Sequence, residues 1–249
     1  TLFKVGDRVS HASMPIGAYS EKHIMPENKL VPVPDGVSDE VASCVTLKGI
    51  TAEYLLHRAY PLKKGDKVLY HAAAGALGQI LCPWANSIGA EIIGTVGSKE
   101  KEEIAKKNGC HHVINYTDKN FVEEVEKIVG KNGIDVVYDG VGLKTFEGSI
   151  EVLKIRGMMV AFGNASGYVD TIDVKKHINA KGLFFTRPSI AHYTIEREEL
   201  LESAKKVFDA VLSGKFKIEI SKKYSLEEVK QAHEDLEGRL LTGPAVIKP

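Results

Sequence analysis

A glycine-rich turn between a predicted strand and a predicted helix is the feature of this chain best suited to chemistry. In KVLYHAAAGALGQ, Ala73, Gly75 and Gly78 occupy the three fixed positions of the dinucleotide-binding pattern G-x-G-x-x-G. Gly75 would let the backbone approach a pyrophosphate, and the amides that start the following helix would bind phosphate. Because Ala replaces the first glycine, the turn requires a negative φ at Ala73. The alternative is a tight strand-to-helix turn that holds no nucleotide.

The end of the next predicted strand indicates which dinucleotide would bind. NAD enzymes carry a carboxylate about 20 residues beyond the glycines, but here the chain reads GTVGSKEK, with Gly97 and Ser98 at that point. A small glycine, a hydroxyl and the ammonium of Lys101 suit the dianionic 2′-phosphate of NADP(H). The alternative is that Lys101 is a solvated charge in the first turn of a helix, where the helix dipole disfavours it.

The elements that must position these residues follow from the pattern of apolar runs. Between about residues 40 and 181, short apolar runs alternate with longer helical stretches, which predicts an α/β fold with a doubly wound parallel sheet buried on both faces. The candidate helices lie near residues 77–88, 99–108, 121–129 and 144–153. The flanking sequence differs: the N-terminal part is rich in Gly, Pro and short Val-containing runs, which predicts small strands and turns.

Composition excludes several classes of partner. The 33 basic and 33 acidic residues of this 249-residue chain cancel, so no global positive field would gather nucleic acid or anionic membrane. No apolar run reaches the ~18 residues of a membrane span, and the N-terminus does not have the pattern of a signal peptide. The 3 cysteines are widely spaced and fit neither a disulfide framework nor a C-x-x-C metal motif. We therefore expect a cytoplasmic protein whose partners are small molecules.

Eight short segments distributed along the chain form a joint pattern. They are LKGITAEYLL, HAAAGALGQ, GTVGSKEK, HHVINY, VVYDGVG, GMMVAFGNASG, FFTRPS and LEGRLLTG. Together they resemble the NADPH-dependent quinone oxidoreductases, the zeta-crystallin-like, zinc-free branch of the medium-chain dehydrogenase/reductase superfamily. The resemblance implies a partial GroES-like β-rich catalytic domain at 1–45, a Rossmann NADP-binding domain at 46–185, and a C-terminal segment at 186–249 that returns to the catalytic domain.

The resemblance also implies which residues contact the cofactor NADP(H). They are Tyr54 at the base of the cleft, Ala76 and Leu77 at the pyrophosphate, Gly97, Ser98, Lys101 and Tyr116 around the 2′-phosphate, Val141 beside the adenine, Phe162, Gly163 and Asn164 near the nicotinamide, and Arg239 reaching back toward the cofactor. The alternatives are helix packing for Tyr54, a half-buried aromatic at a strand end for Tyr116, and a surface salt bridge for Arg239.

Zinc catalysis is not expected. By the resemblance, Leu47 stands where related alcohol dehydrogenases carry a zinc-ligating Cys, and Cys44 lies three residues away. His111 and His112 are adjacent, so they point to opposite faces of a strand and cannot share a metal. Asp139 is expected to be a turn residue at a strand end rather than a catalytic acid.

No catalytic residue is assigned, because no acid/base pair is evident. The expected reaction is direct hydride transfer from NADPH to a quinone, with a proton taken from a side chain or water. The alternatives are an alkenal or enone (2-enoyl) reductase, which would act on another conjugated carbonyl substrate, and a non-catalytic NADPH-binding protein.

Two further expectations concern the N-terminus and assembly. Thr1 opens on strand-like sequence that matches the later part of the family's barrel, so an N-terminally truncated chain with an open substrate pocket is expected. Family members associate through the edge strands of their Rossmann sheets, and KGLFFTRP would be the last strand of the sheet here. A homodimer is therefore expected; the alternative is a strand covered by its own chain.

Overall fold

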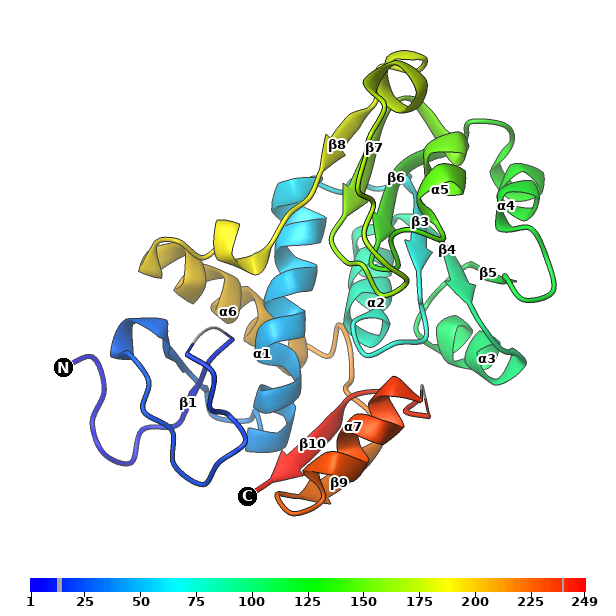
Figure 1. The fold of residues 1–249 in the computed structure, drawn as a ribbon. Coiled ribbons are helices and arrows are strands. Elements are labelled where there is room, and N and C mark those ends of the chain that lie inside the picture. Colours follow the sequence, from blue (N-terminus) through cyan, green and yellow to red (C-terminus); the bar gives the residue numbers. More distant parts are fainter. Residues whose placement is uncertain (13–14, 239) are drawn as a thin grey trace. The chain divides into compact units, whose positions relative to one another are not determined.

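The computed structural model describes residues 1–12, 15–238 and 240–249, and the chain divides into two compact units (Figure 1). The first unit contains Thr1–Tyr54, Gly75–Ile80 and Ile190–Pro249, and the second contains Leu55–Ala74 and Leu81–Ser189. No helix in the described part of the chain combines the length and the apolar character that a membrane span needs.

The second unit is built on a six-stranded sheet in the order β5-β4-β3-β6-β7-β8. The strands are β3 (Lys67–His71), β4 (Glu91–Val96), β5 (His112–Asn115), β6 (Ile134–Asp139), β7 (Leu153–Ala161) and β8 (Phe184–Thr186). Every neighbouring pair is parallel. This is the strand order of a doubly wound dinucleotide-binding sheet, whose switch point lies between β3 and β6. The predicted α/β fold with a Rossmann-type parallel sheet is confirmed.

Helices follow the strands of the sheet in alternation. They are α2 (Gly78–Ile88), α3 (Lys99–Lys107), α4 (Phe121–Val129), α5 (Phe146–Val152), and the shorter η2 (Leu55–Ala59) and η3 (Val174–Asn179). α4 and α5 cover one face of the sheet, where Val125 and Ile150 join a core that includes Leu69, Val137 and Met159. Because these sheet residues are fully buried, the short apolar runs of the sequence form strands rather than surface elements.

Local signals fix the ends of these helices. Asn120 caps α4, because its side chain accepts a hydrogen bond from the amide of Val122, and Gly130 follows the helix with a φ of 81°. The helix predicted near 121–129 is therefore observed with the predicted bounds. The helix predicted near 144–153 begins only at Phe146 and is followed directly by β7 at Leu153.

The first unit contains little sheet. The strands β1 (Val9–Ser10) and β2 (Val31–Pro32) pair antiparallel, and β9 (Lys222–Ser225) pairs parallel with β10 (Ala245–Lys248). Its helices are η1 (Glu27–Lys29), α1 (Asp39–Tyr54), η4 (Ile190–His192), α6 (Arg197–Leu212) and α7 (Val229–Glu237). α1 and α6 are joined by the fully buried carboxylate of Glu53, which accepts hydrogen bonds from Ser203 at 2.8 Å and from Lys206 at 3.3 Å.

Candidate functional site

The turn that follows β3 is closely packed against the neighbouring strand. Ala73 is fully buried, and its amide donates to the carbonyl of Thr95 on β4 at 3.0 Å. A Cβ added to Gly94 on β4 would lie 2.6 Å from the Cβ of Ala73. The residue with a positive φ is Ala72, at 62°, and Ala73 does not share that conformation. An Ala is therefore accommodated at the first glycine position because the facing residue is Gly94.

The end of β4 and the end of β5 bring together the residues expected around a 2′-phosphate. The amide of Tyr116 donates to the carbonyl of Val96 at 3.1 Å, which holds the two strand ends side by side. A Cβ on Gly97 would lie 2.5 Å from the phenolic oxygen of Tyr116. Ser98 is the N-cap of α3, and its hydroxyl accepts from the amide of Lys101 at 3.4 Å. Gly97, Ser98, Lys101 and Tyr116 are thus neighbours.

This strand end is polar and open to solvent. Tyr116 is 44% exposed, and Ser98 and Lys101 are partly buried. The first turn of α3 also carries the acidic residues Glu100 and Glu102. A hydrogen bond from its own backbone amide, followed by one from Ser98, lowers the pKa of the Glu100 carboxyl. Glu100 was not among the predicted site residues, and its carboxylate would compete with a bound phosphate for the Ser98 hydroxyl.

The loops that follow β6 and β7 contact each other closely. The amides of Phe162 and Gly163 donate to the carbonyl of Asp139, at 2.9 and 3.2 Å. A Cβ on Gly163 would lie 2.7 Å from the Cα of Gly140, and one on Gly142 would lie 3.1 Å from the Cα of Asn164. The structure thereby brings Val141, between these glycines, close to Phe162, Gly163 and Asn164.

Asp139 ends β6 and is fully buried. Its Oδ1 accepts from the amides of Val141 and Gly142, at 2.7 and 3.0 Å. Its Oδ2 accepts from the hydroxyl of Thr145 at 2.7 Å and from that of Ser149 at 3.5 Å. Asp139 therefore organises the turn after β6, the role that was expected for it.

The remaining predicted residues belong to the first unit. Tyr54 is 2% exposed and stacks on Tyr193, with ring centroids 4.4 Å apart and planes at 7°. This packing matches the alternative of helix packing, and a contact between Tyr54 and a cofactor stays a prediction. Ala76 and Leu77 are half-buried in the turn before α2. Arg239 lies outside the described residues.

The residues present do not fit a zinc site. Cys44, Cys82 and Cys110 are each buried. Burial is the largest cause that raises the pKa of the Cys44 thiol, whereas a zinc ligand must be a thiolate. Within residues 1–12, 15–238 and 240–249, no group of three or more His, Cys, Asp or Glu side chains could hold a metal ion.

Comparisons with known proteins give the chain its family. Residues 76–212 match the family described as zinc-binding dehydrogenase. A 2-haloacrylate reductase from a Burkholderia species is 45% identical over 100% of this chain and 76% of the relative. A quinone oxidoreductase from Pseudomonas aeruginosa is 41% identical over 100% of this chain and 77% of the relative.

A solved structure gives the same assignment. The crystal structure of Escherichia coli quinone oxidoreductase complexed with NADPH matches with a TM-score of 0.95 and 41% identity, covering 99% of this chain and 76% of the other. The likeness therefore extends over both units and is found in sequence as well as in fold. The predicted resemblance is confirmed. The chain belongs to the zinc-binding dehydrogenase family, as a member of its quinone oxidoreductase branch.

Proposed function

We propose that this protein is an NADPH-dependent oxidoreductase that transfers a hydride to a quinone. The observation that carries the proposal is the cluster of Gly97, Ser98, Lys101 and Tyr116 at the carboxyl ends of β4 and β5. A glycine without a Cβ, two hydroxyl groups and an ammonium form a surface suited to a phosphate dianion. The Escherichia coli relative was solved with NADPH, which supports the same cofactor here.

The chain's own residues would bind and orient the cofactor along its length. We propose the following contacts: Ser98, Lys101, Tyr116 and Gly97 to the 2′-phosphate, Val141 to the adenine, Phe162, Gly163 and Asn164 near the nicotinamide, Ala76 and Leu77 to the pyrophosphate, and Tyr54 and Arg239 as further contacts. Bound NADPH supplies a hydride from C4 of its nicotinamide ring. The family description names zinc, but the described residues do not fit that metal, and no step is assigned to it.

A conjugated carbonyl compound is the second candidate substrate. The 45% identical relative is a 2-haloacrylate reductase, and an acrylate contains a carbon–carbon double bond conjugated to a carboxylate. A quinone and an acrylate both accept a hydride at one end of a conjugated system and a proton at the other. Turnover of NADPH with a quinone and with 2-chloroacrylate, compared as kcat/KM, separates the two. Binding of NADPH without turnover of either would favour a non-catalytic protein.

The cofactor assignment is tested by titrating the protein with NADPH and with NADH. We expect NADPH to bind more tightly, and Lys101→Ala to weaken NADPH binding by about 10-fold or more while it leaves NADH binding unchanged, because a charge-assisted hydrogen bond contributes roughly 1.5–3 kcal/mol. Lys106→Ala is the matched control, because Lys106 lies on the same helix and pairs with Glu103. Equal affinities for the two cofactors, or an unchanged preference in Lys101→Ala, would contradict the proposal.

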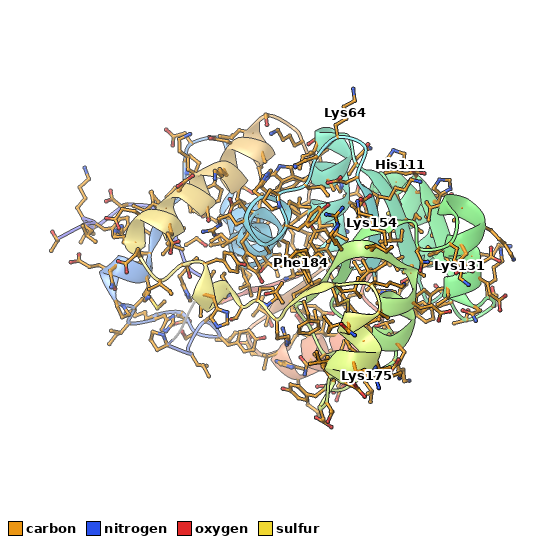
Figure 2. The ribbon with its side chains drawn as sticks, turned by 90° about the horizontal axis from the view of Figure 1, so that it is seen from above. Lys64, His111, Lys131, Lys154, Lys175 and Phe184 are labelled. Carbon is orange, nitrogen blue, oxygen red and sulfur yellow. The ribbon has the colours of Figure 1, made fainter. Side chains whose placement is uncertain are left out.

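We further propose a cytoplasmic homodimer. β8 is an edge strand of the sheet and carries Phe184, which is labelled in Figure 2. Its side chain is 60% exposed. An unpaired edge with an exposed aromatic favours pairing with the same strand of a second copy. Phe184→Glu is expected to shift the mass in light scattering from dimer to monomer; a monomeric mass for the unchanged protein would contradict the dimer. The 3 free, buried cysteines suit a reducing compartment, which cell fractionation would test.

A further inference from the structure

A chain of buried side-chain hydrogen bonds crosses the sheet at its switch point. His71 ends β3 and Asp139 ends β6, and these two strands are neighbours in the sheet. His71 is 1% exposed. Its Nδ1 lies 2.9 Å from the hydroxyl of Thr95 on β4, and its Nε2 lies 2.9 Å from the hydroxyl of Ser149 on α5. Ser149 in turn reaches Asp139, so the chain runs from β4 to the carboxylate.

One arrangement of donors and acceptors satisfies all of these contacts with a neutral imidazole. The Ser149 hydroxyl donates a hydrogen bond to Asp139 Oδ2, because a carboxylate oxygen accepts. Ser149 Oγ then accepts from His71 Nε2–H, and Nδ1 accepts from the Thr95 hydroxyl. In this arrangement His71 carries its proton on Nε2. Burial lowers the pKa of the imidazole, in opposition to the charge of Asp139, and this agrees with a neutral ring.

The other oxygen of the carboxylate holds the turn that carries Val141. Asp139 Oδ1 is the acceptor for the amides of Val141 and Gly142. Gly142 has a φ of 89°, and a Cβ there would lie 2.6 Å from the carbonyl oxygen of Gly167, so the turn has little room to relax. Removal of the carboxylate would leave both amides without this partner.

We propose that Asp139 is a positioning residue for the cofactor: it fixes the turn that presents Val141, and Ser149 and His71 hold its carboxylate in place. The inference rests on the proposed function, because Val141 is assigned there to the adenine half of NADPH. Asp139 itself is fully buried and is not placed in contact with the cofactor. Its carboxylate holds the amides of Val141 and Gly142, whereas Phe162 and Gly163 donate to its main-chain carbonyl, which a side-chain substitution keeps. The effect of losing the carboxylate is therefore expected in the affinity for the adenosine half and not in the hydride transfer step.

The test compares Asp139→Ala with Asp139→Asn. The Asn side chain keeps an oxygen that can accept from Val141 and Gly142, and its amide can donate to Thr145 or Ser149, whereas Ala removes both. We expect Asp139→Ala to raise the Kd and KM for NADPH at least 10-fold, with kcat at saturation within 3-fold of the unchanged protein. Asp139→Asn should stay within 3-fold in all three. With reduced nicotinamide mononucleotide, which lacks the adenosine half, neither variant should change KM.

Amide hydrogen exchange provides a readout that does not depend on turnover. Exchange at Val141 and Gly142 should be at least 10-fold faster in Asp139→Ala than in Asp139→Asn. Unchanged exchange and unchanged NADPH binding in Asp139→Ala would overturn the inference, as would a loss of kcat with KM unaffected.

If Asp139→Ala does not fold, Ser149→Ala takes its place, with an expected rise in the Kd for NADPH of about 3-fold. An unchanged Kd in Ser149→Ala would also overturn the inference. If the unchanged protein does not bind NADPH, the proposed function fails, and exchange still decides whether Asp139 fixes the turn.

Discussion

Two regions at the carboxyl edge of the same parallel sheet are built in different ways: one follows the outer strands β4 and β5, and the other follows the central strands β3 and β6. At the ends of β4 and β5, Ser98, Lys101 and Tyr116 are at least partly exposed to solvent. At the ends of β3 and β6, His71 and Asp139 are buried, and every polar atom of their side chains has a hydrogen-bond partner within the protein.

The exposed side chains after β4 and β5 can form new hydrogen bonds, whereas those of His71 and Asp139 are already committed to partners inside the protein. A phosphate bound after β4, as proposed, would meet side chains that are at least partly exposed, so its binding would break no buried hydrogen bond. A change at the β6 end breaks bonds in a region from which water is excluded, and each broken bond leaves a buried group unpaired. We therefore propose ligand contact for the first region and support of the ligand-contacting loops for the second.

The largest expected effect comes from adding a methyl group to a glycine in each region. In Gly163→Ala the new Cβ meets the backbone of Gly140, which cannot move aside, so we expect a loss of about 3 kcal/mol in the free energy of unfolding. In Gly97→Ala it meets the phenolic end of Tyr116, an exposed side chain that can rotate, and a loss below about 1 kcal/mol is expected. Urea denaturation measures both. Equal losses would remove the distinction between the regions.

Loss of one hydroxyl in each region tests the comparison more finely. Ser149→Ala leaves the buried Nε2 of His71 without its hydrogen-bond partner, and we expect a loss of about 2 kcal/mol. Ser98→Ala removes the N-cap of α3, at about 1 kcal/mol. The measurement is again the free energy of unfolding in urea, and a larger loss for Ser98→Ala would reverse the assignment.

A smaller effect concerns pH. Burial lowers the pKa of His71 below its ordinary value of 6.5, so in mildly acidic solution the unfolded chain takes up a proton that the folded chain does not. This contribution to stability is complete above pH 6.5 and declines as the pH falls below it. His71→Gln lacks it, so its Tm should fall less than that of the unchanged protein between pH 7.5 and 5.5, by circular dichroism. Between pH 7.5 and 8.5 the two should run parallel; parallel curves throughout would contradict a buried neutral His71.

The smallest expected change in stability is that of Tyr116→Phe. Tyr116 is 44% exposed, so water is available to its neighbours when the hydroxyl is removed, and the free energy of unfolding should change by less than about 0.5 kcal/mol. If Tyr116 contacts the 2′-phosphate, NADPH affinity falls several-fold and NADH affinity does not, as isothermal titration would show. A change of equal size for both cofactors would place Tyr116 away from the phosphate.

Local features of the fold could be predicted from the sequence alone. The alternation of apolar runs and helical stretches predicted the parallel sheet, and the helix at Phe121–Val129 was predicted with its observed bounds. In the structure Asn120 and Gly130 mark its two ends. The late start of α5 was not predicted, since Thr145 is drawn into a hydrogen bond with Asp139. Among its described residues, the Gly- and Pro-rich N-terminal segment has two strands of 2 residues each. Their length was not predictable, because turn residues show where strands are interrupted and not how long they are.

The sequence by itself determined the nucleotide-binding pattern and the absence of a carboxylate directly after β4, because each of these features lies within one short continuous segment. Only the tertiary structure decided why Ala73 is tolerated, since the space for its methyl group is made by Gly94 on another strand. It alone joined His71 to Ser149, 78 residues apart, and so gave Asp139 its supporting role. Periodicity reports which face of an element is buried, whereas hydrogen bonds across the sheet depend on strand order and register, which no local pattern encodes.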